Sequence, residues 1–309
     1  ESYESMNKLN SDKYEFVYPN YSLSKAIDLE SDLIESLDFS SIGNQKKFST
    51  NIYEATQVND LILTSSKFIN KLGFNNKLKT IIKNVNSDSN NSSKLKEKKQ
   101  SELLTLISYD VDVPLVKEDG DYLNLLIPKL SLRFSPNDTK NLKDEDRLLS
   151  TDNIFSLNRI GFNETIEGGG SLTLGLDYEK KNQRNGHLFD AKVATVFRDE
   201  LNENLPTSST LGKKQSDFVG ELRYIPNTKF TFDYNFSVNN DLDQMNFHSL
   251  ENSFKVNNFV NTFTFYEENN IVGKKSYYEN TLSYKFNENN SFSFKTRENK
   301  TDNLTEYYN

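Results

Sequence analysis

Hydrophobic and polar residues alternate along much of this chain, and the alternation is clearest between residues 229 and 240. Every second position there is aromatic or aliphatic, and small polar or acidic residues stand between these positions. The first set is Phe230, Phe232, Tyr234, Phe236 and Val238, and the second is Thr231, Asp233, Asn235 and Ser237. Successive side chains of a strand point to opposite faces, so the pattern predicts a strand with one aromatic and one hydrophilic face.

The same two-residue period recurs elsewhere, and no stretch keeps a 3.6-residue period over three turns. About fifteen segments fit strands of roughly ten residues with alternating polarity, which is typical of a transmembrane β-barrel. These segments are 13–25, 31–41, 60–70, 73–84, 97–113, 121–134, 168–181, 186–199, 215–225, 229–240, 243–257, 259–268, 274–286, 290–300 and 303–309. The sequence therefore predicts an all-β chain that forms an antiparallel transmembrane β-barrel or an incomplete arc of one.

The connections between these segments alternate in length. Long connections at 85–96, 135–167 and 200–214 alternate with short ones at 114–120, 182–185 and 226–228. Strands that cross one membrane are expected to have short periplasmic turns and longer extracellular loops. The alternative is a large secreted β-sandwich or solenoid, in which one face also alternates. A sandwich gives no reason for long and short connections to alternate. A solenoid needs a repeat of fixed period, and none is visible, so we favour the barrel.

Composition excludes several other classes of protein. Hydrophobic residues make up 35% of the chain and the mean hydropathy is −0.73, values that fit either disorder or a fold with one polar face. The 22 Phe and 16 Tyr residues argue against disorder, because disordered chains are poor in aromatics. No apolar run approaches the roughly 18 residues of a spanning helix, so any crossing has to be made by strands. The net charge of −8 argues against a nucleic-acid partner.

Residues that carry chemistry are sparse. The chain has no cysteine, which excludes disulfides and thiolate metal sites within it. Its two histidines, His187 and His248, lie far apart and in no recognisable serine motif, which argues against a metal site and against a hydrolase triad. The run 168–170 is Gly-Gly-Gly without the Lys-Ser/Thr of a phosphate loop, so we expect a flexible beginning of a strand there. We predict no enzyme activity, no metal and no cofactor.

One group of motifs is specific enough to suggest a family. Residues 152–161 read Asp-Asn-Ile-Phe-Ser-Leu-Asn-Arg-Ile-Gly, followed by Glu-Gly-Gly at 167–169 and a strand at 171–178. Upstream lie the runs 112–115, 126–130 and 133–136, each with a proline. This order of motifs resembles the LptD family, outer-membrane translocons that insert lipopolysaccharide into the outer leaflet. Weaker similarities lie at 73–74, 83–84 and 305–309.

The resemblance implies an integral protein of the bacterial outer membrane that transports lipopolysaccharide. It implies a barrel of about 26 strands, of which residues 1–309 would be an interior arc within one domain. The N-terminal periplasmic domain and the final strands of the family would then be absent. The implied partners are lipopolysaccharide, a lipoprotein plug in the lumen, membrane lipid, and a periplasmic bridge that the missing N-terminal domain would contact. A general porin and a TonB-type receptor barrel remain alternatives.

Candidate functional residues fall into two groups. The family-motif loop contributes Asp152, Asn153, Phe155, Arg159, Gly161, Glu167, Gly168 and Gly169. The polar rows expected to face the lumen contain Thr231, Asp233, Asn235, Ser237, Glu221 and Arg223. The loop 135–167 is longer than structureless loops usually are, so we expect it to be ordered and folded into the lumen. There the charge of Arg159 would pair with acidic residues of the loop, namely Asp144, Glu145, Asp146 and Asp152.

Overall fold

The computed structural model describes residues 2–4, 14–48, 51–92, 95–269 and 275–308 of the chain. Its first nine strands are β1 (Ser2–Glu4), β2 (Tyr14–Ile27), β3 (Ile34–Phe48), β4 (Tyr53–Ser65), β5 (Phe68–Ile69), β6 (Asn75–Asn90), β7 (Gln100–Asp112), β8 (Leu115–Asp119) and β9 (Tyr122–Ser135). The others are β10 (Gly169–Asn182), β11 (Leu188–Arg198), β12 (Phe218–Asn227), β13 (Phe230–Val238), β14 (Met245–Val256), β15 (Phe259–Glu268), β16 (Lys275–Lys285), β17 (Ser291–Asn299) and β18 (Leu304–Tyr308). A 3-10 helix, η1 (Thr210–Gly212), lies between β11 and β12.

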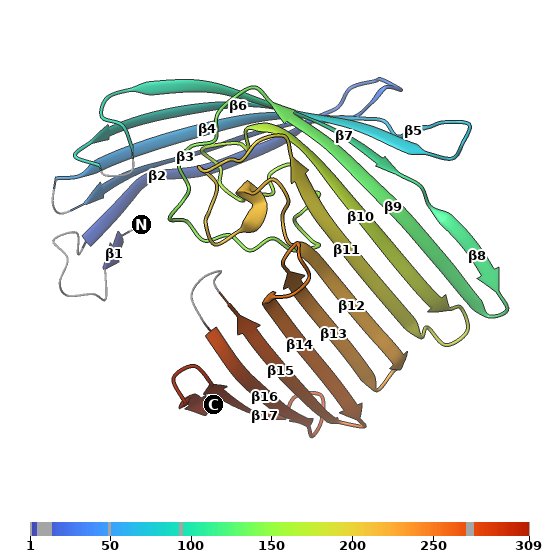
Figure 1. Cartoon of the computed structure of the whole chain (residues 1–309). Coiled ribbons are helices and arrows are strands. Elements are labelled where there is room, and N and C mark those ends of the chain that lie inside the picture. The colour runs from blue at the N-terminus through green and yellow to red at the C-terminus, as the bar shows by residue number, and fades with distance from the viewer. Residues whose placement is uncertain (1, 5–13, 49–50, 93–94, 270–274, 309) are drawn as a thin grey trace.

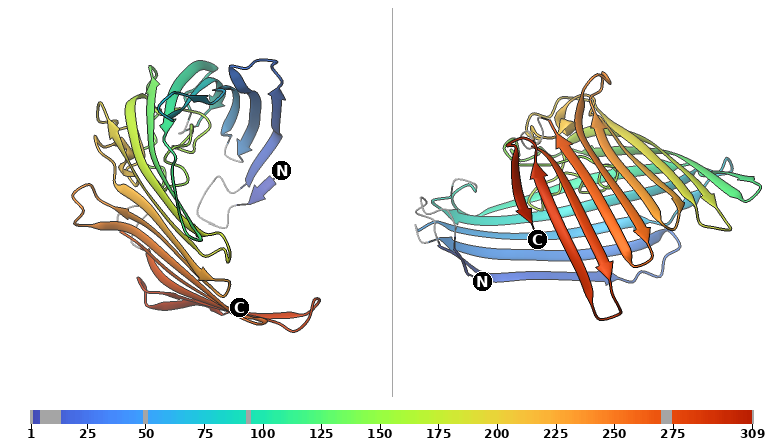
Figure 2. Two further views of the ribbon diagram at one scale, coloured as in Figure 1. Left: turned by 90° about the vertical axis from the view of Figure 1, so that its right-hand side faces the viewer. Right: turned by 90° about the horizontal axis from the view of Figure 1, so that it is seen from below.

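All the described strands belong to one antiparallel sheet in which most strands pair with their neighbours along the chain. The exceptions are β4, which pairs with β6, and β7, which pairs with β9; the short strands β5 and β8 extend the hairpins there. The sheet curls into an open arc, with β1 at one edge and β17–β18 at the other (Figures 1 and 2). The all-β antiparallel fold and the incomplete arc predicted from the sequence are therefore confirmed. No helix in the described part of the chain has the length and apolar character that a membrane-crossing helix needs.

Each of the fifteen predicted segments overlaps a strand, but several boundaries were wrong. The prediction for β15 matches its observed bounds, whereas β4 begins at Tyr53 rather than at residue 60. The predicted turn 114–120 contains a strand, β8, that continues the hairpin with β9. Pro114 interrupts β7 and β8 because it has no backbone N–H to donate to the ladder.

From β9 onward the connections at the two ends of the sheet differ in length, as predicted. The segments 91–99, 136–168 and 199–217 lie at one end, which we call the loop end. The opposite end, the turn end, has the tight turns 183–187, 228–229 and 257–258. Asn257 has a φ of 51°, the left-handed conformation that two-residue hairpin turns require and that asparagine tolerates.

The two longest loops, 136–168 and 199–217, fold back into the concave side of the arc (Figures 1 and 2). This identifies the face of each strand. Thr151 of the first loop donates to Glu221, so Glu221 lies on the concave face of β12. The register then places Asn235, the partner of Glu221, on the concave face of β13, and Phe232, the partner of Tyr224, on the convex face.

The convex face of β13 should therefore be the one that contacts lipid. In the full-length protein, Phe232→Arg is expected to cost roughly 2–4 kcal/mol if the site lies near the bilayer midplane. The matched control is Asn235→Arg, whose new charge would lie on the polar concave face beside Glu221. Folding yield and heat-modifiable mobility on gels measure the difference, and equal tolerance of the two variants would contradict the face assignment.

Candidate functional site

The loops 136–168 and 199–217 pack against each other and against the concave face of the sheet. Leu142 N donates to Asn204 O at 2.7 Å, and Thr207 N donates to Lys143 O at 3.2 Å. A buried apolar cluster joins both loops to β11 and β12; its members are Leu142, Leu149, Ile154, Ile160, Ala194, Val196, Leu205, Leu211 and Val219. The two loops therefore form one folded unit with its own core, which we call the inner plug.

The triple glycine at 168–170 marks the point where the first loop closes onto the sheet. A Cβ on Gly168 would lie 2.2 Å from Asn137 O, so the two ends of the loop can meet only at a glycine. Gly169 has a φ of +82°, which glycine adopts without strain. The N–H of Gly170 donates to the Asp199 carboxylate at 3.0 Å, and a Cβ there would lie 2.7 Å from it. These glycines permit close packing, rather than the flexibility expected from the sequence.

Arg159 and Glu167 form an ion pair at the centre of the plug, and both side chains are almost wholly buried. Arg159 Nε donates to Glu167 Oε2 at 2.6 Å, and Nη2 donates to Glu167 Oε1. The guanidinium also donates to Ile154 O and, at 2.8 Å each, to the hydroxyls of Thr173 and Ser171 on β10. These five contacts match the five N–H donors of an arginine, so the buried charge is fully hydrogen-bonded.

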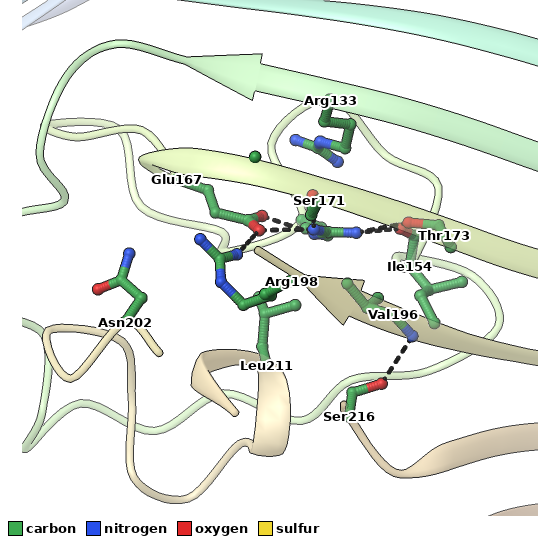
Figure 3. A network of polar contacts seen from close by, with 12 residues as sticks. Arg133, Ile154, Glu167, Ser171, Thr173, Val196, Arg198, Asn202, Leu211 and Ser216 are labelled. Carbon is green, nitrogen blue, oxygen red and sulfur yellow. Dashed lines mark hydrogen bonds and ion pairs between the residues drawn. The ribbon is translucent and has the colours of Figure 1, made fainter. Parts of the chain in front are cut away.

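Two further arginines from the sheet point into the same cluster (Figure 3). Arg198 at the end of β11 donates to Glu167 Oε1 and to Gly168 O. Arg133 on β9 donates to Ser156 O at 2.6 Å and to Leu157 O at 2.5 Å. The Glu167 carboxylate thus lies near three arginines. Through Arg133 and Arg198, β9 and β11 are hydrogen-bonded to the loop.

The charges around Glu167 control its protonation. Burial alone raises the pKa of this carboxyl, but Arg159, Arg133 and Arg198 outweigh burial and lower the pKa to about 2. Arg159 therefore pairs within the loop, as expected, but with Glu167 rather than with the acidic residues proposed from the sequence. Asp144, Glu145, Asp146 and Asp152 are exposed.

The other residues of the family motif shape the loop. Asn153 accepts from Ser150 N at 3.0 Å and donates to Leu148 O, which closes a turn. The Phe155 ring lies where a side chain at Gly175 of β10 would be, 2.7 Å from its Cβ position. Gly161 has a φ of +79° and lies under the Arg147 guanidinium.

The polar rows predicted to line a lumen lie on the concave face. Glu221 also accepts from Lys192, and Arg223 pairs with Asp233 at 3.0 Å. Ser237 is buried and donates to Asp217. Thr231 and Asn235 complete the row on β13.

Sequence reasoning missed the roles of Arg133 and Arg198 and the packing of the second loop, of which it predicted only the length. Arg133 stands between Ser131 and Ser135 in the polar row of β9, so the pattern gave its face but no hint of its partner. The second loop carries no motif. Among the described residues, no three His, Asp or Glu side chains gather in a way that could hold a metal ion. His248 lies beside Glu267 on the convex face, and His187 follows a turn.

Comparison with known families gives one match. The model of the family LptD, LPS transport system D, matches residues 30–303, which include the inner plug and nearly all the strands. No curated protein matches the chain.

Removal of the Arg159 charge should open the inner plug. Arg159→Ala leaves Glu167 buried with fewer donors, and loss of one partner of a buried ion pair costs roughly 3–5 kcal/mol. We expect the loop 136–168 to become sensitive to protease while the strands stay folded. Arg184→Ala removes an exposed pair with Asp121 and is the matched control, for which no change is expected. Protease resistance equal to that of the wild type in Arg159→Ala would contradict this role.

The plug should also loosen in acid. Because folding lowers the pKa of Glu167 from 4.5 to about 2, its ionised form stabilises the plug above about pH 4.5. This stabilisation is lost progressively as the pH falls from 4.5 towards 2. Pepsin cleavage within 136–168 should therefore rise over this interval in the wild type. The Glu167→Gln variant should be cleaved more readily than the wild type at pH 4.5, and its cleavage should depend less on pH. Identical cleavage profiles for the two proteins would contradict the role assigned to Glu167.

Proposed function

Because the chain belongs to the LptD (LPS transport system D) family, whose members transport and assemble lipopolysaccharide at the outer membrane, we propose that this sheet forms part of the barrel wall past which the lipopolysaccharide headgroup moves. The observation that carries the proposal is the polar concave face of β13–β17, most of which the inner plug leaves uncovered (Figure 1). It lies opposite a convex face rich in aromatic residues.

The concave face suits an amphiphile with a sugar headgroup. Its rows are Thr231, Asp233 and Asn235 on β13, Ser249, Glu251 and Ser253 on β14, Thr262 and Thr264 on β15, Glu279, Thr281 and Ser283 on β16, and Ser293 and Lys295 on β17. Hydroxyls and amides bind sugar hydroxyls, while acyl chains need contact with the hydrocarbon outside the wall. A polar interior and an apolar exterior on the same strands provide both environments.

The charges on this face are of mixed sign, and several of them form ion pairs. Arg223 pairs with Asp233 at 3.0 Å, and Lys295 pairs with Glu279 at 2.8 Å. Ion-selective pores usually carry rings of one sign. The mixed surface favours contact with glycans and with a protein, and we propose that a luminal lipoprotein occupies this space.

The loop end should be extracellular and the turn end periplasmic. Single cysteines at Glu203 in the second loop and at Thr228 in a tight turn, both exposed, test the orientation in the full-length protein. An impermeant thiol reagent on intact cells is expected to label Glu203→Cys only, and permeabilised cells should label both. Labelling of Thr228→Cys alone on intact cells would invert the orientation.

The bare concave face should contact a protein. Photo-crosslinking residues at Asn235 and Ser283 in the full-length protein are expected to capture a small lipoprotein, while one at Phe232 on the convex face should not. Depletion of the captured protein should reduce surface lipopolysaccharide. Free ion conductance through the purified barrel, with no captured partner, would favour a porin instead.

A further inference from the structure

The convex face changes character along β3, β4 and β6. Near the turn end it is apolar, with Phe39, Leu61 and Ile82 side by side. Towards the loop end the same outward positions become polar on all three strands and on the neighbouring β7. The residues there are Ser41, Gln57, Asn59, Asn84, Asn86 and Ser101, which we call the outer polar row.

Side-chain hydrogen bonds connect the outer polar row across five strands. Tyr21 of β2 contacts Ser41 at 3.3 Å, and Ser41 donates to Asn59 at 2.7 Å. Asn59 donates to Asn84 at 3.2 Å. The row ends on β7, where Ser101 donates to Asn86 at 2.8 Å.

In this region the apolar residues point inward and the polar residues point outward, the reverse of the arrangement on β13. Val58 and Val85, the neighbours of Asn59 and Asn84 along their strands, are 3% and 2% exposed. They lie on the concave face against Ile166 of the inner plug. Apolar residues inside and polar residues outside are the arrangement of a water-soluble sheet, not of one facing hydrocarbon.

The lengths of the strands agree with this division. β6 has 16 residues and β3 has 15, yet each carries only two or three apolar outward positions. β13 has 9 residues, and all five of its outward positions are aromatic or aliphatic. An amide side chain has four hydrogen-bonding positions, and the bonds along the row use only some of those of Asn59. Burial of the remaining polar positions in hydrocarbon is unfavourable, so we expect the outer polar row beyond the hydrocarbon, at the level of the lipid headgroups.

A shallow depression of about 360 Å³ adjoins the row, lined by Gln57, Asn86, Asp88, Lys99 and Ser101 among others. Amide and hydroxyl groups match sugar hydroxyls, and the Lys99 ammonium matches a phosphate. The exposed side chains of Ile82 and Leu103 lie next to the row, where acyl chains would pack.

We propose that the outer polar row and its depression bind the phosphorylated sugar headgroup of a glycolipid in the outer leaflet, from outside the barrel. The site is separate from the concave face. The inference rests on the outer-membrane location and on the orientation proposed above, with the loop end outside the cell.

Photo-crosslinking in the full-length protein tests the site directly. A photo-reactive residue replaces Gln57 in one variant and Val238, an outward apolar position at the loop end of β13, in the control. Adducts are analysed for sugar phosphates and for glycerophospholipids. We expect several-fold more sugar-phosphate adduct at Gln57 than at Val238. Equal yields, or glycerophospholipid adducts alone at Gln57, would overturn the proposal.

A second experiment distinguishes glycolipid binding by the row from a purely structural role, in which its hydrogen bonds only stabilise the sheet. The double variant Asn59→Leu/Asn84→Leu removes the central amides, and Thr80→Leu, at an outward position in the apolar half of β6, is the control. Native mass spectrometry of the purified protein should show a retained glycolipid in the wild type and in Thr80→Leu and its loss in the double variant. Unchanged retention with lowered thermal stability would mean that the row only braces the sheet. Since retention does not require transport, failure of the transport function would leave this result intact.

Discussion

Each strand of this sheet presents its side chains alternately to two different surroundings, and the other features of the structure depend on that constraint. A shift of register by one residue would exchange the two faces of a strand, so the pattern fixes the pairing. On β13 the aromatic face packs outward, and the Phe236 ring lies over Gly220, 2.1 Å from where a Cβ would be. The opposite face keeps acids and amides where they can meet water, a ligand or another protein.

A polar concave face cannot hold a loop by apolar contact alone. The inner plug therefore combines a small apolar core with a cluster in which three arginines surround Glu167. The desolvation of these charges is unfavourable, and it is offset only because the donors of Arg159 all find acceptors. The two arginines contributed by β9 and β11 fix the position of the loop against the wall. The loop is thus part of the fold, and its acidic run remains free to face solvent.

The sequence alone was sufficient for the fold class, because a two-residue period needs no tertiary information. It also indicated that the 135–167 loop is ordered and that Arg159 pairs within it. The partner was predicted wrongly, since Asp152 is nearer in the motif but Glu167 is nearer in space. Arg198 could not be identified, because its partner lies 31 residues away and no local pattern connects them. The glycines of 168–170 were predicted to be flexible, because the sequence does not show their close packing against Asn137 and Asp199.

The predicted boundaries of β3 and β4 were wrong for a physical reason. The same reason divides the arc into two parts. Where the plug covers β4, β6 and β7, the concave face carries Val58, Ile81 and Val85 against Ile166, and the convex face carries amides. A prediction that expects apolar residues on the lipid-facing side assigns these parts of the strands to loops. Their residues still alternate, but the apolar ones lie on the concave side. From β9 to β13 the convex face is apolar along most of each strand. One continuous sheet therefore has the residue pattern of a membrane wall over part of its surface and that of a water-soluble β-sheet, with the plug as its core, over the rest.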